Sequence, residues 1–271
     1  MKFMLIAEIQ RKRLPVVIDN LHKKIAVARF ALSSSVLPLA TDAMPFAEMT
    51  RFAVSHNRAG NSFSRALIGK EWNADLQKWL PLKGHEHAHF FATDEDGDGR
   101  LDHLTVFAPC GFNADDLEAL GQIHSVKRPK NLPSTKLVLT GLGNKVDFPA
   151  IPIFGKSKIW RSVTPFSLPN FPNRGGGKPP RPKDLPEAQL LKELKSRNLP
   201  APVRIKRSDG YQTEKRPPMR WLEFYDQRLR KETHGKGLYG FEIEFETEVE
   251  GPIAVGFGCH FGLGLFLPVR F

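Results

Sequence analysis

The chain has 271 residues, of which 41% are hydrophobic, enough to bury one large core or two ordinary ones. Its formal net charge of +11 favours a polyanionic partner, such as nucleic acid or an anionic membrane surface. The alternative is a basic surface that serves only solubility. The 2 cysteines exclude a disulfide framework, and no apolar run reaches membrane-spanning length. We therefore expect a cytoplasmic protein without a membrane partner.

Residues 1–24 are assigned as an N-terminal extension, and residues 25–147 as a first domain. Periodicity in this domain predicts strand, helix, strand, strand, helix and strand, in that order, over 25–32, 42–55, 85–90, 103–108, 113–123 and 136–141. Residues 56–83 show no clear period and are expected to form a long loop. The order is that of a ferredoxin-like domain, in which the helices cover one sheet face and the other stays open.

The two central strands of this domain form a predicted hairpin that is rich in histidine. On the first strand, period-two alternation places His85, His87 and His89 on one face. A register that sets His103 of the second strand beside His89 would gather four imidazoles there. Phe91 and Phe107 would share this open face, where RNA-recognition modules stack bases, with Leu104, Val106, Ala88 and Phe90 under the helices. A register slip of one residue would reverse the assignment.

The histidine pattern supports two kinds of chemistry. His85 or His87, together with His89 and His103, could hold zinc with an open water position. Alternatively, one imidazole acts as general acid or base in metal-free phosphodiester cleavage. For any single histidine, a hydrogen-bonded structural role is the alternative. His56, beyond the first helix, is a further candidate for the acid–base role.

The loop of the hairpin carries Asp94, Asp96, Asp98 and Asp102, which imitate the first half of a calcium-binding loop. Thr105 replaces the glutamate that ends that pattern, and no helix precedes the loop. The two interpretations are a calcium site and a polar hairpin turn.

Residues 148–183 are assigned as a basic, Gly- and Pro-rich connection. The segment contains no acidic residue and seven cations: Lys156, Lys158, Arg161, Arg174, Lys178, Arg181 and Lys183. Its glycines and prolines would let these cations adapt to a phosphate chain, and the alternative is a plain basic linker.

Residues 184–271 are assigned as a second α+β domain. A capping box of Asp184 and Glu187 predicts a helix to about Asn198, followed by strands at 203–207, 220–225 and 240–248. The chain then ends in paired Gly-x-Gly units, in which Gly256, Gly258, Gly262 and Gly264 bracket Cys259, His260 and Phe261. These glycines either let backbone amides approach phosphates or bases, or relieve crowding where strands cross.

Four segments together resemble a known family: GHEHAHFFATDEDGDGRLDHLTVFAP, SVTPF, DLPEAQLLKELKSRNLPAPV and GPIAVGFGCHFGLGLF. They are similar to the C-terminal half of the fused Cas-five and Cas-six subunit of type I-U (I-G) CRISPR systems, over residues 25–271. That half resembles the Cas-six family of CRISPR repeat endoribonucleases. Residues 1–24 are too short for the Cas-five half. The resemblance implies two tandem ferredoxin-like (RRM-like) domains and a Gly-rich loop that grips repeat RNA.

The resemblance also implies an activity, namely metal-independent cleavage of precursor CRISPR RNA by the ribose 2′-hydroxyl, without a cofactor. The partners would be repeat RNA, whose hairpin is retained, and other subunits of a type I effector complex. The catalytic candidates are His85, His87, His89 and His56, and the family's habit of placing this residue just after the first helix favours His56. The RNA-binding candidates are Arg161, Arg174, Lys178, Arg181, Gly256, Gly258, His260, Phe261, Gly262 and Gly264. The alternatives are a non-cleaving guide-RNA-binding subunit and a zinc-dependent hydrolase.

Overall fold

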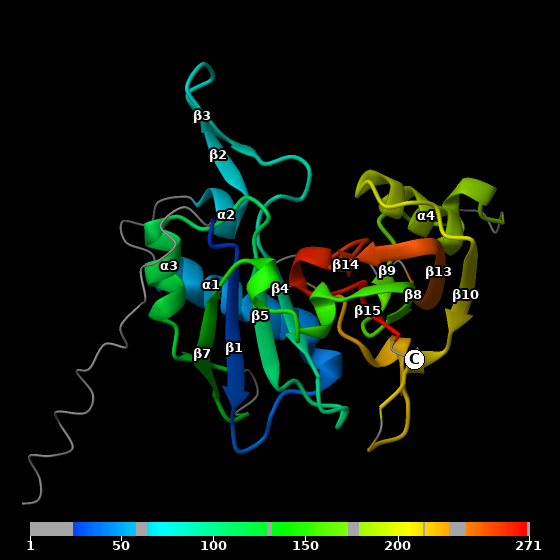
Figure 1. Ribbon diagram of the computed structural model, residues 1–271, viewed down its shortest axis with the longest axis horizontal. Coiled ribbons are helices and arrows are strands. Elements are labelled where there is room, and N and C mark those ends of the chain that lie inside the picture. The colour runs from blue at the N-terminus through cyan, green and yellow to red at the C-terminus, as the bar shows by residue number, and fades with distance from the viewer. Residues whose placement is uncertain are drawn as a thin grey trace, which may run out of the picture.

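The computed structural model describes residues 24–57, 64–128, 132–172, 179–213, 215–227 and 237–269. The expected N-terminal extension lies outside these ranges except for Lys24. Figure 1 shows a first half, residues 24–147, and a second half, residues 148–269, each built on an antiparallel sheet. The protein is therefore a mixed α+β protein. None of the described helices is both long and apolar enough to cross a membrane.

The first sheet has five strands in the order β4-β5-β1-β7-β6, and every neighbouring pair is antiparallel. Their bounds are β1 (Val27–Ser33), β4 (His89–Thr93), β5 (His103–Phe107), β6 (Ser125–Val126) and β7 (Thr135–Gly143). The helices α1 (Ala43–Asn57) and α3 (Ala114–Gly121) complete the predicted order of strand, helix, strand, strand, helix and strand.

Both helices pack against one face of the first sheet. Phe90, Leu104 and Val106 belong to the same buried cluster as Phe46 of α1 and Leu120 of α3. This confirms the predicted inner face of the histidine hairpin. The reason is that strand alternation leaves one face of β4 and β5 almost wholly apolar, and burial under the helices removes this face from water.

The expected long loop at 56–83 instead contains α2 (Arg65–Ile68) and a hairpin of β2 (Lys70–Asn73) and β3 (Lys78–Pro81). The hairpin projects from the first half beside α2 (Figure 1). Trp72 lies opposite Trp79, with ring centroids 5.5 Å apart. The long-loop prediction was wrong because these short strands bury little apolar surface, so their composition lacks the alternation that marks a half-buried strand.

The second sheet follows the order β10-β13-β8-β15-β14, and β9 (Phe166–Ser167) pairs with β13 beside this path. Its strands are β8 (Lys156–Ser162), β10 (Arg204–Ser208), β13 (Leu238–Glu250), β14 (Ile253–Ala254) and β15 (Leu265–Pro268). Helix α4 (Pro186–Ser196) buries Leu190 and Leu194 against Trp160 and Phe241 of this sheet.

β8 lies inside the segment expected to be a basic connection, and it is an inner strand of the second sheet. Lys156, Lys158 and Arg161 are exposed, whereas Ser157 and Trp160 are buried. The cations therefore occupy the solvent face of a strand. The segment 148–183 is not a simple connection, because its apolar residues complete the second core.

The strand expected at 220–225 is short. β12 (Met219–Arg220) pairs with β11 (Gly210–Tyr211), and the chain then turns into the 3-10 helix η7 (Trp221–Glu223). Tyr211, Met219, Trp221 and Phe224 join the buried cluster of the first half. This arm of the second half, residues 210–213 and 215–224, thereby crosses to the first half.

The sheet face that was expected to be open is covered by the second half. Phe91 is 0% exposed and clusters with Ile153 and Leu265, and the Phe107 ring centroid lies 5.5 Å from that of Phe154. Burying a phenylalanine side chain stabilises a fold by roughly 1.5–3 kcal/mol, which explains why these rings are covered. The prediction that Phe91 and Phe107 form an open base-stacking surface is therefore wrong.

Candidate active site

The glycine strap, residues 256–264, brings the C-terminal part of the chain onto the first half. Within the strap, the 3-10 helix η8 (Cys259–Phe261) is bounded by Gly258 and Gly262, whose φ values of 74° and 80° are left-handed. A Cβ at Gly262 would lie 3.3 Å from the carbonyl oxygen of Phe90 in β4. Glycine is needed there because it combines the left-handed turn with close approach to the strand backbone. The strap thereby holds the His260 side chain against the start of β4.

Four imidazoles pack together where the glycine strap meets the start of β4. These residues form the histidine cluster: His85, His87, His89 and His260. The ring centroid of His260 lies 5.1, 3.8 and 3.9 Å from those of His85, His87 and His89, respectively. Three of these residues were predicted to share one strand face. Only His89 lies in β4, because Gly84 and His85 adopt left-handed φ values of 77° and 58° and form a turn before the strand.

His103 does not join the histidine cluster. In the observed register, His103 pairs with Thr93, whereas His89 pairs with Phe107 at the other end of the hairpin. The His103 Nδ1 atom lies 2.9 Å from Asp102 Oδ1. The expected four-imidazole surface and the expected zinc ligand set with His103 are therefore wrong. The fourth imidazole is His260, which comes from the opposite end of the chain.

His56 also lies apart from the histidine cluster. It is an exposed residue in the last turn of α1, not in the loop beyond the helix. With His124 and Lys127 it lines a separate depression of about 590 Å³.

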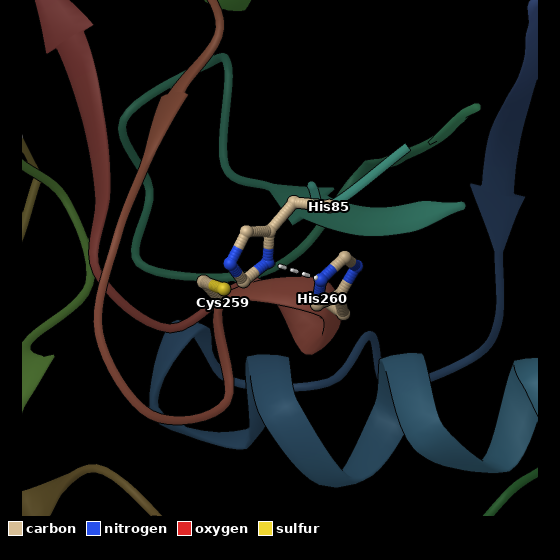
Figure 2. Close-up of side chains that lie close together, drawn as sticks. All are labelled: His85, Cys259 and His260. Atoms are coloured by element: carbon tan, nitrogen blue, oxygen red, sulfur yellow. Dashed lines mark hydrogen bonds between the residues drawn. The ribbon is translucent and has the colours of Figure 1, made fainter. Parts of the chain in front are cut away.

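Hydrogen bonds assign the tautomers of His260 and His85. The His260 Nδ1 atom lies 3.2 Å from the Ala88 carbonyl oxygen, which can only accept, so Nδ1 carries the proton. The His260 Nε2 atom is then an acceptor, and it lies 2.9 Å from His85 Nδ1, which must donate (Figure 2). This leaves the Nε2 atom of His85 unprotonated, with no hydrogen-bond partner among the described residues.

Burial keeps the histidine cluster neutral. It lowers the pKa of His87 to about 4 and that of His89 to about 3, and repulsion between neighbouring imidazoles adds to the effect. The pKa of His260 is also lowered, first by burial and then by His89. Burial and the Arg197 charge lower the pKa of His85. Neutral imidazoles can accept protons or bind metals, but they are poor proton donors.

An open pocket of about 530 Å³ gives access to the histidine cluster. Its lining includes His85, His87, Arg51 and Lys70. The Arg51 guanidinium lies 5.4 Å from the centroid of the Phe261 ring, a cation–π distance. Sequence reasoning missed both cations, because an isolated Arg on a helix and a Lys in a presumed loop are typical of solvated surfaces.

The strap glycines divide into two groups. Gly256 and Gly258 line the pocket together with His260 and Phe261. Gly264 lies away from the pocket lining, and a Cβ there would come 1.8 Å from the Val255 carbonyl oxygen. For Gly262 and Gly264 the contacts favour the interpretation that glycine relieves crowding.

Among the described residues, the RNA-binding candidates Arg161 and Arg181 do not line this pocket. Arg161 Nη2 donates to Glu242 Oε2 at 2.6 Å, and Arg181 Nε lies 4.0 Å from Asp184 Oδ2. Arg174 and Lys178 lie outside the described residues.

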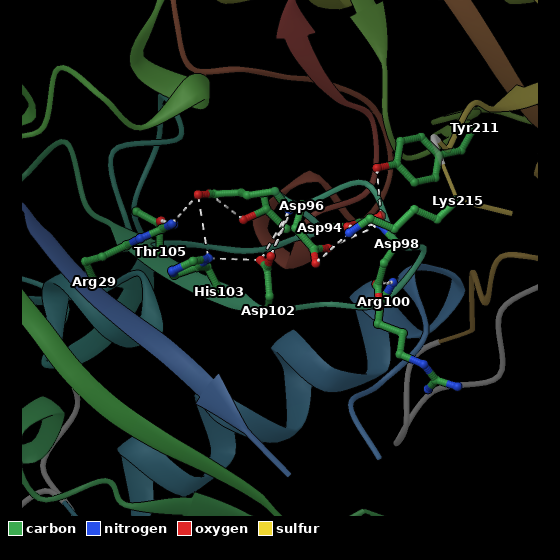
Figure 3. A network of polar contacts seen from close by, with 12 residues as sticks. Arg29, Asp94, Asp96, Asp98, Arg100, Asp102, His103, Thr105, Tyr211 and Lys215 are labelled. Atoms are coloured by element: carbon green, nitrogen blue, oxygen red, sulfur yellow. Dashed lines mark hydrogen bonds and ion pairs between the residues drawn. The ribbon is translucent and has the colours of Figure 1, made fainter. Parts of the chain in front are cut away.

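The aspartate loop forms a network of its own (Figure 3). Carboxylate oxygens of Asp94, Asp96 and Asp102 lie within 4.8 Å of one another. Tyr211 Oη donates to Asp94 Oδ2 at 3.0 Å, and Lys215 Nζ lies 3.2 Å from Asp96 Oδ2. Burial raises the pKa of both Asp94 and Tyr211. The loop thus binds the arm of the second half, and calcium binding stays a prediction.

The opposite side of the same network fixes the loop to the sheet. Arg29 is buried, and it donates to Thr105 Oγ1 and to Glu95 Oε2, each at 2.6 Å. A buried guanidinium needs such partners, which accounts for the position of Glu95.

The Cys259 thiol is free and buried. Its Sγ atom accepts a hydrogen bond from Arg197 Nη2 at 3.3 Å. Burial raises the pKa of this thiol, and Arg197 opposes the shift. Among the described residues, His85, Cys259 and His260 offer N, S and N atoms that lie within 4.8 Å of one another.

No protein-family model matches the sequence, and no curated protein matches it. Among solved structures, the chain is similar to Csf5, described as a CRISPR-Cas type IV Cas6 crRNA endonuclease. The TM-score is 0.37 at 11% sequence identity, and the superposition covers 91% of this chain and 100% of that chain. A likeness at this level does not define a family.

Proposed function

We propose that this protein is a cytoplasmic endoribonuclease that processes precursor CRISPR RNA within its repeats, without a metal, and retains the repeat-derived hairpin. The observation that carries the proposal is the His85–His260 hydrogen bond at an open pocket that also contains cations. The positive net charge suits an RNA substrate. Other subunits of a type I effector complex would receive the processed guide.

We infer also that the two halves are tandem ferredoxin-like domains. The inference is supported by strand order, since β4-β5-β1-β7 and β10-β13-β8-β15 place the corresponding strands of each half in the same sequence. In the first half both crossover helices are present. In the second half the described residues contain α4 only, and the glycine strap stands where the second helix would be.

His85 is the proposed general base. Its unprotonated Nε2 atom takes the proton from the ribose 2′-hydroxyl, whose oxygen attacks the adjacent phosphorus. His260 is a positioning residue, because it accepts a hydrogen bond from the Nδ1–H of His85 and so keeps the Nε2 atom of His85 unprotonated. The P–O bond to the 5′-oxygen then breaks, which leaves a cyclic phosphate and a 5′-hydroxyl.

Two cations complete the proposed chemistry. The Arg51 guanidinium is held beside Phe261 and can offset the charge that develops on the phosphorane. The departing 5′-oxygen needs a proton, and we assign this donation to the Lys70 ammonium, which lines the same pocket. Removing a general acid or base of this kind typically costs a factor of 10² to 10⁴ in rate.

A non-cleaving guide-RNA-binding subunit is the second candidate function. The observation that favours it is the low pKa of His87 and His89, which keeps these two imidazoles neutral, and therefore poor general acids, at neutral pH. In that case the pocket cations would hold RNA without cutting it.

The experiment is incubation of the protein with its own repeat RNA in chelator, beside a matched RNA that lacks the 2′-hydroxyl at the cleavage site. We expect cleavage of the first RNA only, loss of cleavage in His85→Ala, and normal cleavage in His56→Ala. Binding of both RNAs without cleavage of either supports the second candidate. Activity that is abolished by chelator contradicts metal-free chemistry.

A further inference from the structure

His85, Cys259 and His260 form a compact group that proton transfer alone does not explain. One member comes from the turn before β4, and two come from the glycine strap. Figure 2 shows the His85 ring with one nitrogen directed at His260 and with the Cys259 sulfur on its other side. The ligating atoms of the three residues lie within 4.8 Å of one another.

The donor set selects a class of ion. Two imidazoles and one thiolate suit zinc and other borderline-soft transition metals, whereas calcium and magnesium prefer oxygen ligands. The three side chains also line the open pocket. An ion bound there has an entry path and a free coordination position, as in sites with three protein ligands and one exchangeable ligand.

Hydrogen bonds from neighbouring residues already orient His260 and Cys259 as metal ligands. Metal-bound histidines usually donate their second ring N–H to a carbonyl or carboxylate. The His260 Nδ1–H does this towards the Ala88 carbonyl oxygen at 3.2 Å, so its Nε2 lone pair faces the group. Arg197 Nη2 donates to Cys259 Sγ, which favours the thiolate form of the sulfur.

We propose that His85, Cys259 and His260 bind one zinc-class ion, and that the bound ion switches off RNA cleavage. The second clause rests on the proposed function, because zinc would occupy the nitrogen atoms that the His85–His260 proton pathway uses. Binding replaces the proton of the Cys259 thiol with the metal, and that proton goes to solvent. The Nδ1 proton of His85 moves to its own Nε2 atom, so that the Nδ1 lone pair can bind the ion and Nε2 can no longer act as a base.

The geometry requires only local adjustment. Tetrahedral zinc ligands stand roughly 3.3–3.7 Å apart, given Zn–N and Zn–S bonds of about 2.0 and 2.3 Å. The His85–His260 nitrogen pair at 2.9 Å must open slightly, and the other pairs, which are at most 4.8 Å apart, must close by no more than about an ångström. Arg197 opposes a cation electrostatically, but its Nη1 atom lies 3.7 Å from Glu193 Oε2, which offsets that charge.

The first test measures metal binding without RNA. The full chain is titrated with Co²⁺ and then with Zn²⁺, and the thiolate-to-cobalt charge-transfer band reports on a cysteine ligand. We expect one equivalent of Co²⁺ to give the band and Zn²⁺ to displace it. Cys259→Ala should abolish the band and weaken Zn²⁺ binding by at least about 100-fold, since even outer-shell partners are worth 10- to 100-fold.

Two variants guard against a folding artefact. Cys110→Ala removes the other thiol, which is outside the group, and should leave the band unchanged. His85→Ala alters a half-buried turn residue, and it should shift the cobalt spectrum and weaken binding while the unfolding transition stays cooperative. The ligand assignment is overturned if the wild-type protein gives no band, if Cys259→Ala keeps it, or if Cys110→Ala loses it.

The second test measures cleavage of repeat RNA with and without Zn²⁺. We expect full activity in chelator and at least a tenfold loss with one equivalent of Zn²⁺ per chain. A protein that gives the cobalt band but never cleaves contradicts the proposed function and leaves the metal site standing. Cleavage that is unaffected by bound Zn²⁺ contradicts the proposed inhibition. Cleavage that requires Zn²⁺ contradicts it as well, because the ion would then activate the enzyme.

Discussion

At the scale of single residues, His260 makes two hydrogen bonds, and together they determine which nitrogen of His85 is free to accept a proton. The Nδ1–H of His260 donates to the Ala88 carbonyl oxygen, and its Nε2 atom accepts a hydrogen bond from the Nδ1–H of His85. A residue that positions the general base does not bind the substrate itself. Its loss should therefore appear in the rate of the chemical step, not in the affinity for RNA.

We predict that His260→Ala lowers kcat for repeat-RNA cleavage by about 10- to 100-fold, with little change in KM, because His85 loses its acceptor. His260→Gln should recover part of the activity, since the amide oxygen of glutamine can replace Nε2 as an acceptor. Single-turnover kinetics on both variants measures the effect. Equal loss in both variants, together with a raised KM, would argue for a structural role.

The buried imidazoles also make stability depend on pH. His89 has a pKa of about 3 in the folded protein, below its ordinary value of 6.5, because burial disfavours its charged form. Between these values the unfolded chain binds more protons than the folded one, so stability falls as pH falls from about 6.5 towards 3.

In chelator, we predict that the free energy of unfolding drops by a few kcal/mol between pH 7 and pH 4, as measured by urea titration at each pH. His87, with a pKa of about 4, adds to the drop in the same direction. His89→Gln should flatten the dependence. A stability that is constant over this pH range would show that the imidazoles reach water.

At the scale of elements, the β2–β3 hairpin rises from the edge of the pocket. Lys70, the first residue of β2, lines the pocket, and His85 follows shortly after β3. Trp72 is 49% exposed and lies against Trp79. Aromatic rings placed beside a cationic pocket are suited to stack unpaired bases.

We predict that Trp72→Ala weakens binding of repeat RNA by about 5- to 150-fold, which corresponds to roughly 1–3 kcal/mol for one base stack. Stability should change little, because the side chain is half exposed. Leu76→Ala is the matched control, because Leu76 lies at the tip of the same hairpin and is 56% exposed. This variant should bind repeat RNA normally. Fluorescence anisotropy measures both, and equal affinities would place the RNA elsewhere.

At the scale of the whole molecule, the two halves are joined by buried rings, by the glycine strap and by polar contacts. The Tyr211 hydroxyl in the arm of the second half donates to Asp94 in the loop of the first. This contact is partly buried, so its loss leaves a carboxylate with one donor fewer in a region shielded from water.

Tyr211→Phe should lower the free energy of unfolding by about 1–2 kcal/mol, since it removes a hydrogen bond to a charged group. Tyr225→Phe is the control, because that side chain is 51% exposed and should be neutral. Thermal unfolding of the two variants side by side makes the measurement. If Tyr211→Phe is as stable as the wild type, the hydrogen bond to Asp94 does not contribute to holding the halves together.

Local pattern determined much of the fold. Alternation in β4 and β5 identified the face under α1 and α3, and the order of elements in the first half followed from periodicity and helix caps. Half-exposed segments such as β2 and β3 escaped detection, because a strand that buries little apolar surface leaves no alternating pattern.

The sequence by itself determined that histidines gather before β4 and that glycines bracket His260, since both are short-range patterns. Only the tertiary structure decided that these two segments meet, that His103 lies at the far end of the hairpin, and that Phe91 is covered. Register and interfaces between halves depend on packing between residues far apart in the chain. No local periodicity encodes such contacts, because their free energy arises only when distant surfaces leave water together.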